Sequence, residues 1–422
     1  MPEEPKERGV WAEVYVRDFL ALPFICEFVF RSLQTLDGTQ KEVADLLVAY
    51  PGVSILASQK TQKDPFARSP GKTLSWAQKE AKKAASQLCG ALRTARGKPV
   101  WCDHPRRGRV ELPDGLPDIN HGIVLIEVFE RVDLNAKAGD LPLRYHNTPI
   151  TYLSLNDFLN VALELRTAPE VLAYLDARRA LPYTDLRIIG DEKALFEFYL
   201  LQGGSLAGCA GKADAAVAVA ARHDELGRAL KSKWEHDRYS GLLEDVADQL
   251  ATRRHDYAVG LSAEALARYD EPDKRANYLK MQAVIANLGL RERSELGRAF
   301  DDTMRRRELS GSVFSHRAMH VDSKPEWVYV VGSSAGIKPS DLEQIKMNLM
   351  VAALANFRKT HCLLLIDRDK ASYEVGLMIQ PTPPSSPAER ALGDKFFGRL
   401  RMTDSELALI PRSVGDVGHR DF

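Results

Sequence analysis

Residues 38–64 read GTQKEVADLLVAYPGVSILASQKTQKD, and this stretch decides the fold of the first part of the chain. Two apolar runs, Val43–Tyr50 and Val53–Lys60, flank the dipeptide Pro51-Gly52. Pro-Gly is a strong turn signal, and short apolar runs on both sides of a turn are typical of a buried β-hairpin. The stretch therefore predicts two antiparallel strands that are joined by a tight turn.

Polar side chains stand on both predicted strands where a plain core strand carries none. Asp45 lies early in the first run, and Ser58, Gln59 and Lys60 close the second run. An ionised aspartate on an apolar strand is costly unless it is paired or binds a metal. One interpretation is an ion pair between Asp45 and Lys60 that closes the hairpin, and the other is a functional site.

This arrangement resembles the core of the PD-(D/E)XK, or restriction-endonuclease-like, nuclease superfamily, and the wording of the stretch also looks like bacterial members of it. In that family an Asp opens one strand of a hairpin, an acid and a Lys two residues apart end the next strand, and a Glu on the preceding helix often joins them. Asp45 and Lys60 match the Asp and the Lys. Glu27 matches the Glu, with the preceding helix expected at about residues 24–32. The resemblance covers roughly residues 15–130.

The resemblance implies a metal-dependent endonuclease that cleaves phosphodiester bonds in DNA, in DNA processing or bacterial defence. Asp45 and Glu27 are then the expected ligands of Mg²⁺ or Mn²⁺, and Lys60 assists the attacking water. Ser58 departs from the family pattern because it stands where the acid is expected, and it offers only a neutral oxygen. Glu42, just before the first strand, is a candidate to compensate as a metal ligand. The alternative is a catalytically inactive nuclease-like module that binds nucleic acid or a protein partner, and the loss of the acid at Ser58 favours it.

Downstream of the hairpin, Ser75 to Ala95 reads as a helix that begins with a capping box at Ser75–Gln78 and carries a stripe of alanines. Lys79, Lys82 and Lys83 lie away from that stripe. Such residues usually form a solvated face, and the functional interpretation is that they contact nucleic-acid phosphates.

The segment WCDHPRRGRVEL, residues 101–112, offers two further interpretations. Cys102, Asp103 and His104 invite a metal site or a catalytic triad, but no second His/Cys cluster completes such a site. Arg106 and Arg107, together with Arg109, are better candidates for contact with anions.

The rest of the chain predicts an α/β protein with three regions. Residues 1–203 are expected to form a mixed sheet flanked by helices, with further helices that begin at Ser154 and Thr167. Residues 204–322 are expected to be helical, with a connection at residues 310–325 that leads into the last region. Residues 323–422 are expected to form a small α/β domain with the order strand, helix, strand, strand from Trp327 to Ile379, followed by a Pro-rich segment and a polar tail. Within the last region, GSSAG at 332–336 lacks the Gly-Lys-Ser/Thr ending of a phosphate-binding loop, so a plain strand-to-helix turn is expected.

Composition limits the partners and the location of the protein. The 422 residues include 58 basic and 58 acidic residues, so contact with nucleic acid requires a local basic face. The five cysteines are dispersed, which is typical of reduced thiols in a cytoplasm. There is no signal-peptide pattern and no apolar run long enough to span a membrane. We therefore expect a cytoplasmic protein that binds DNA and no membrane, and oligomer formation stays open.

Overall fold

The computed structural model describes residues 25, 28–36, 42–50, 53–62, 69–95, 98–104, 108–112, 119–128, 130–136, 141–256, 280–368 and 372–398. The described residues form two compact units, and the chain passes from the first to the second between Leu230 and Lys231. The fold is mixed α/β, with an eight-stranded sheet in the first unit and a four-stranded sheet in the second. This confirms the predicted fold class. The three-region division of the sequence stays a prediction.

The sheet of the first unit is antiparallel at one side and parallel in its centre. Its strand order is β5-β4-β1-β2-β3-β6-β9-β8, and β3, β6 and β9 run parallel to one another. The strands are β1 (Val29–Thr35), β2 (Glu42–Tyr50), β3 (Val53–Lys60), β4 (Val100–His104), β5 (Gly108–Leu112), β6 (His121–Ile126), β8 (Arg144–Tyr145) and β9 (Thr148–Ser154). A separate two-stranded sheet pairs β7 (Val132–Asp133) with β10 (Ile188–Ile189).

The predicted hairpin is β2 and β3, and β3 has the bounds that the sequence predicts. The expected helix at residues 24–32 is wrong for its second half, because β1 begins at Val29. That segment is as apolar as a helix core, but β1 lies between two strands, β2 and β4, where every backbone group can pair. The local composition of this segment is compatible with a helix and with a strand, and pairing with β2 and β4 selects the strand.

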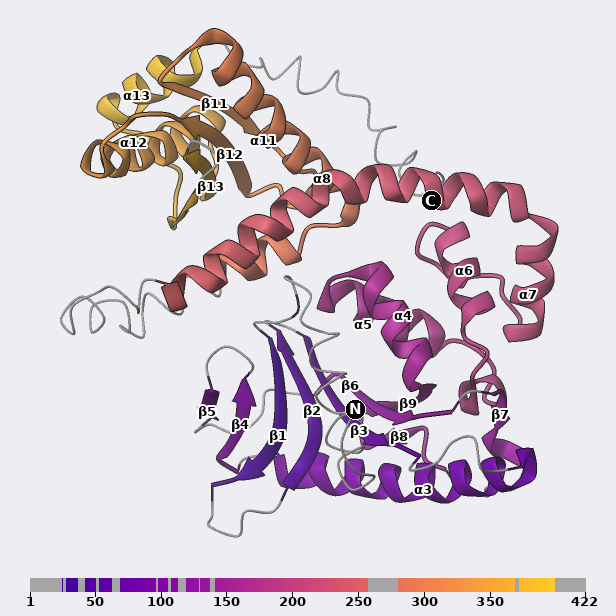
Figure 1. The fold of residues 1–422 in the computed structure, drawn as a ribbon. Helices are drawn as coiled ribbons and strands as arrows, with labels where there is room; N and C mark the ends of the chain where they lie inside the picture. Colours follow the sequence, from indigo (N-terminus) through magenta and orange to yellow (C-terminus); the bar gives the residue numbers. More distant parts are fainter. Residues whose placement is uncertain are drawn as a thin grey trace, which may run out of the picture. The chain divides into compact units, whose positions relative to one another are not determined.

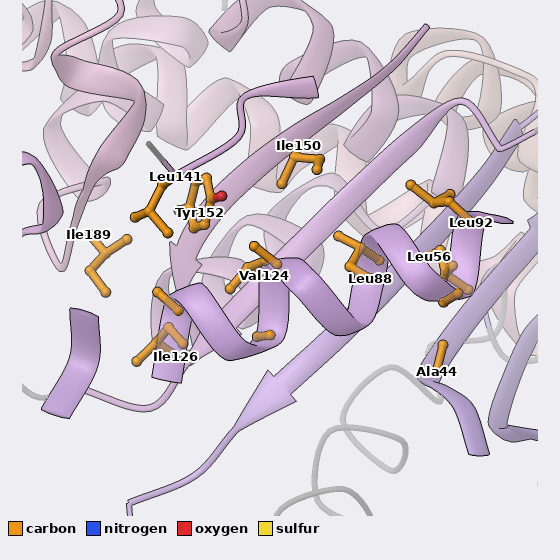
Figure 2. Packing of buried hydrophobic residues seen from close by; sticks show 14 of the residues in the cluster. Ala44, Leu56, Leu88, Leu92, Val124, Ile126, Leu141, Ile150, Tyr152 and Ile189 are labelled. Atoms are coloured by element: carbon orange, nitrogen blue, oxygen red, sulfur yellow. The ribbon is translucent and has the colours of Figure 1, made fainter. Parts of the chain in front are cut away.

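Helix α3 (Pro70–Ala95) covers one face of this sheet. Most of its alanines and leucines are buried against β2, β3 and β6, and Figure 2 shows Leu88 and Leu92 facing strand residues such as Leu56 and Val124. The helix begins five residues earlier than the sequence predicts. Ser75 is no N-cap, because its Oγ donates a hydrogen bond to the carbonyl oxygen of Gly71 inside the helix (3.0 Å).

Other helices of the first unit lie on the opposite face or beyond the end of the sheet (Figure 1). The predicted N-caps are confirmed: Ser154 accepts a hydrogen bond from the Asp157 amide, and Thr167 accepts one from the Glu170 amide. The two capped helices are α4 (Leu155–Leu165) and α5 (Ala168–Arg178). The first unit also contains α6 (Lys193–Leu201), α7 (Lys212–Ala221) and short 3-10 turns at Leu134–Ala136 and Asp185–Arg187.

The second unit contains a four-stranded sheet of order β11-β12-β13-β14, in which β12 and β13 are parallel. Its elements are the end of α8 (His223–Asp256), a helix at 280–286, α11 (Leu290–Ser310), β11 (Phe314–Met319), β12 (Trp327–Ser334), α12 (Pro339–Phe357), β13 (His361–Arg368), β14 (Ser372–Ile379) and α13 (Pro387–Phe397). The predicted strand–helix–strand–strand order from Trp327 to Ile379 is confirmed.

Two elements of the second unit are missing from the sequence prediction. The segment 310–325, expected to be a connection, contains edge strand β11. The segment after the Pro-rich stretch, expected to be a polar tail, contains α13, which begins with a capping box of Ser386 and Glu389. Among the described residues, no helix has the length and apolar content that a membrane crossing requires.

Candidate functional site

The candidate site lies where the β2–β3 ladder ends. The last backbone pair on this side is Leu46 with Ala57, so Asp45 stands next to Ser58 on the neighbouring strand. The Oδ2 atom of Asp45 accepts two hydrogen bonds, one from Ser58 Oγ (3.1 Å) and one from the backbone amide of Gln59 (2.5 Å). The register of the hairpin therefore brings the Asp of one strand to the Ser-Gln-Lys run of the other.

These two bonds explain how an aspartate is tolerated on an apolar strand. A half-buried carboxylate is stable when hydrogen-bond donors satisfy it, and an amide and a hydroxyl do so here. Both bonds go to Oδ2, so among the described residues no hydrogen bond engages Oδ1 of Asp45, and this atom can take another ligand. The structure describes no ion pair between Asp45 and Lys60. The interpretation that such a pair closes the hairpin is therefore wrong for the described structure.

Lys60 ends β3 on the same face of the sheet as Ser58, because side chains two residues apart share a face. It is half-buried and lies beside Ile126 of the parallel strand β6. Its carbonyl oxygen accepts a hydrogen bond from the Glu127 amide (2.9 Å), so the β3–β6 ladder continues to the last residue of β3. Ligands of α/β sheets commonly bind at the carboxyl ends of parallel strands, and Lys60 stands at this end.

Two residues near the carboxyl end of β3 were not among the site residues predicted from the sequence. Glu127 follows strand β6 directly and is buried, but by alternation its side chain faces the side opposite Lys60. Gln62 shares the alternation of Ser58 and Lys60 and is 1% exposed, and its Nε2 has no hydrogen-bond partner among the described residues. An acid at the end of a buried strand is a usable sequence signal for Glu127, whereas no sequence pattern marks Gln62.

The structure tests other predicted site residues only in part. Glu27, Arg106 and Arg107 lie outside the described residues. Glu42 begins β2, but its side chain lies outside the described part. No group of three or more His, Cys, Asp or Glu side chains in the described ranges is arranged to hold a metal ion. The predicted magnesium or manganese site accordingly stays a prediction.

The Cys-Asp-His segment forms strand β4, which β1 separates from β2. Cys102 and His104 are both buried in the core. The sulfur of Cys102 donates to the carbonyl oxygen of Val110 (3.7 Å), and the His104 ring packs edge-on against Phe30. These contacts are those of core residues, and the segment is not joined to Asp45.

Lys79, Lys82 and Lys83 are exposed on α3, as the sequence predicts. They lie on the helix face away from the sheet, opposite the buried alanines. The structure therefore presents them on a surface of their own and does not bring them to Asp45 and Lys60.

The serines of the GSSAG segment are occupied by structural bonds. Ser333 Oγ donates to Asp367 Oδ2 (2.9 Å), and Ser334 Oγ donates to the carbonyl oxygen of Asp367 (3.2 Å). Ser333 Oγ also accepts a hydrogen bond from Arg307 Nε (2.8 Å). Residues 332–334 end β12, and residues 335–338 lead from it to α12, so the expectation of a plain strand-to-helix turn is confirmed.

A buried charge network joins α5, α6 and α7 and had no signal in the sequence. Glu192 accepts hydrogen bonds from Tyr174 Oη (2.7 Å) and from Arg178 Nε (2.5 Å) and Nη2 (3.2 Å), and Lys212 Nζ pairs with it at 2.7 Å. Burial alone would raise the pKa of Glu192, but Arg178 and Lys212 outweigh it and hold the pKa at about 2. Every polar group of the network is used inside the fold, so we assign it a structural role.

Comparison of the chain with protein-family models, with curated proteins and with solved structures found no match.

Proposed function

We propose that the chain is a metal-dependent nuclease that hydrolyses phosphodiester bonds in DNA at the end of the β2–β3 ladder, where Asp45 and Lys60 lie. One observation supports this most: Asp45 contacts Ser58 and Gln59 at the edge where Lys60 ends β3. A carboxylate can help to hold a metal ion and an ammonium group can stabilise negative charge on a phosphate, and here both come from adjacent strands at the carboxyl end of β3.

The residues at this edge fit a weakly held Mg²⁺ or Mn²⁺ ion. Mg²⁺ keeps several waters and is often bound by one or two carboxylates together with substrate phosphates. Asp45 offers Oδ1 for this purpose, because its two hydrogen bonds go to Oδ2. Glu27 and Glu42 are the proposed further ligands. When bound, such an ion lowers the pKa of a coordinated water and neutralises phosphate charge.

Each chain residue then has a separate task. Ser58 donates its hydroxyl hydrogen to Asp45 and thereby fixes the orientation of the carboxylate, so it acts as a positioning residue. The Gln59 amide holds the same oxygen atom from the backbone. Lys60 carries its positive charge beside the reacting phosphate, where it orients water and stabilises the negative charge that develops in the transition state.

A specific observation also favours the second candidate, a nuclease-like module that binds nucleic acid or protein without cleavage. Asp45 ends the β2–β3 ladder by capping the free amide of Gln59, which gives it a structural task that needs no metal. Asp45 alone contributes a described carboxylate to this hydrogen-bonded group, with a serine where a second acid would stand.

Cleavage of plasmid and single-stranded DNA with Mg²⁺ or Mn²⁺, and with a chelator as control, separates the two candidates. Asp45→Asn keeps the shape of the carboxylate and removes its charge, and Lys60→Ala removes the cation. We expect both variants to fold and to lose cleavage by on the order of 10²-fold or more, as for other transition-state contacts.

The matched controls are Asp176→Asn and Lys193→Ala, which change the same residue types on exposed helix surfaces. Full cleavage by both site variants would refute the assignment of this edge as the active site. Metal-independent binding of DNA without cleavage by the wild-type protein would support the binding module instead.

A further inference from the structure

The surface of α3 that faces away from the sheet carries all five basic residues of the helix. At 3.6 residues per turn they fall in an arc of about 100°, and the buried residues fall in the opposite arc. The positions between them in this arc hold only Ser75, Ser86 and Gly90. We call this arc the basic face of α3, and its cations are Lys72, Lys79, Lys82, Lys83 and Arg93.

All five cations are exposed. Within the described part of the chain, no acidic side chain forms an ion pair with any of them. The helix contains a single acid, Glu80, which is half-buried and lies about 60° outside the arc. The whole chain has 58 basic and 58 acidic residues, so this concentration of one sign is a local feature. An uncompensated stripe of positive charge attracts polyanions.

We propose that the basic face of α3 binds the phosphate backbone of double-stranded nucleic acid. The face extends over 22 residues from Lys72 to Arg93, and the 21 rises of 1.5 Å between them give a length of about 32 Å. This length is close to one turn of a DNA duplex, about 34 Å, so a helix that lies along the duplex can contact phosphates that are one helical turn apart. The alanine-rich side of the helix is buried in the hydrophobic core, which leaves the basic face directed away from the sheet.

Two other polyanions fit the face less well. Single strands are commonly held by stacking of bases on aromatic side chains, and the arc contains no aromatic residue. Trp76 lies about 20° outside the arc, but it is half-buried and packs against the hydrophobic core. Anionic membranes are commonly bound by helices that also insert apolar side chains into the lipid, and the arc contains none of these either. Lysine contacts to phosphates carry no sequence information, so binding is independent of base sequence.

The test measures binding of the full chain to a fluorescent 20-base-pair duplex in the presence of a chelator, at several salt concentrations. The variant Lys79→Gln/Lys82→Gln/Lys83→Gln removes three charges. We expect the slope of log K against log[salt] to become shallower by about 2.7, and the affinity at 0.1 M salt to fall by on the order of 10²-fold. A double variant, Lys72→Gln/Arg93→Gln, provides the same test at the ends of the face.

The control removes three exposed lysines elsewhere, as Lys193→Gln/Lys231→Gln/Lys280→Gln. An unchanged slope in both α3 variants, or an equal change in the control, would overturn the inference. Stronger binding to phosphatidylserine vesicles or to a single strand than to the duplex would also overturn it. Binding without metal does not depend on Asp45, so failure here and failure of the proposed nuclease activity are distinguishable.

Discussion

Removal of the charge of Glu192 tests the buried network that joins α5, α6 and α7. Glu192→Gln preserves the shape of the side chain but leaves Arg178 and Lys212 without their shared carboxylate, and these side chains are 0% and 2% exposed. The pKa of Glu192 is held at about 2, against an ordinary value of 4.5. At 1.36 kcal/mol per pH unit, this difference corresponds to about 3 kcal/mol of stability at neutral pH.

The cost of breaking a buried ion pair, about 3–5 kcal/mol, agrees with that value. We expect Glu192→Gln to lower the free energy of unfolding by the lower end of this range. The reason is that burial lowers the pKa of Lys212, so this residue can release its proton once the charge of Glu192 is gone. The folded-state pKa of Glu192 is depressed, so its contribution is complete above about pH 4.5 and is lost as the pH falls toward 2. The stability difference between wild type and variant therefore narrows over this range.

The assay is urea denaturation at pH 7 and at pH 3, with amide hydrogen exchange of α5, α6 and α7 as a local measure within the first unit. The control is Glu197→Gln, whose partner Lys193 is 85% exposed, and a change of less than about 1 kcal/mol is expected there. The reasoning would be refuted if Glu192→Gln lowered the free energy of unfolding by less than about 1 kcal/mol at pH 7, or by the same amount at pH 7 and at pH 3.

Two further predictions concern close packing and a buried histidine. Gly297→Ala would place its Cβ 2.0 Å from the carbonyl oxygen of Tyr239, so we expect unfolding free energy to fall by about 1–3 kcal/mol in denaturation. Gly241→Ala, which meets no atom within 4 Å, is the control and is expected to be neutral or stabilising; equal losses would contradict the packing account. Burial, followed by Arg179 and Arg178, lowers the pKa of His121 to about 3, so its NMR signals are expected not to titrate between pH 8 and 4.5. A midpoint near pH 6.5 would contradict this.

Local patterns in the sequence were sufficient for elements whose limits are set by local chemistry. The hairpin of β2 and β3 follows from Pro51-Gly52 and its apolar flanks, and α4 and α5 follow from their capping residues. Asp45 and Lys60 were recognisable because polar groups interrupted apolar strands. By contrast, β1 looked like a helix, since only its strand neighbours distinguish the two structures.

Other features depended on residues that lie far apart in the chain. Edge strand β11 has a polar sequence, FSHRAM, and it exists because it pairs with β12. The network of Arg178, Glu192 and Lys212 joins three helices, and no spacing in the sequence connects its members. Helix α13 is different, because its capping box at Ser386 and Glu389 was visible within a Pro-rich segment that suggested an extended chain.

The parallel pairing of β3 with β6 determines when the candidate site can be completed during folding. The hairpin of β2 and β3 needs only a local turn, whereas the side-chain oxygen of Asn120 accepts the hydrogen bond of the Ser54 amide (2.6 Å) across 66 positions of the chain. A newly synthesised chain can therefore bring Asp45 next to Ser58 early. The strand that flanks Lys60 arrives only after α3, β4 and β5 have been made. Until then the outer edge of β3 is open, and a chain stalled at this stage exposes an unpaired strand that is prone to aggregation.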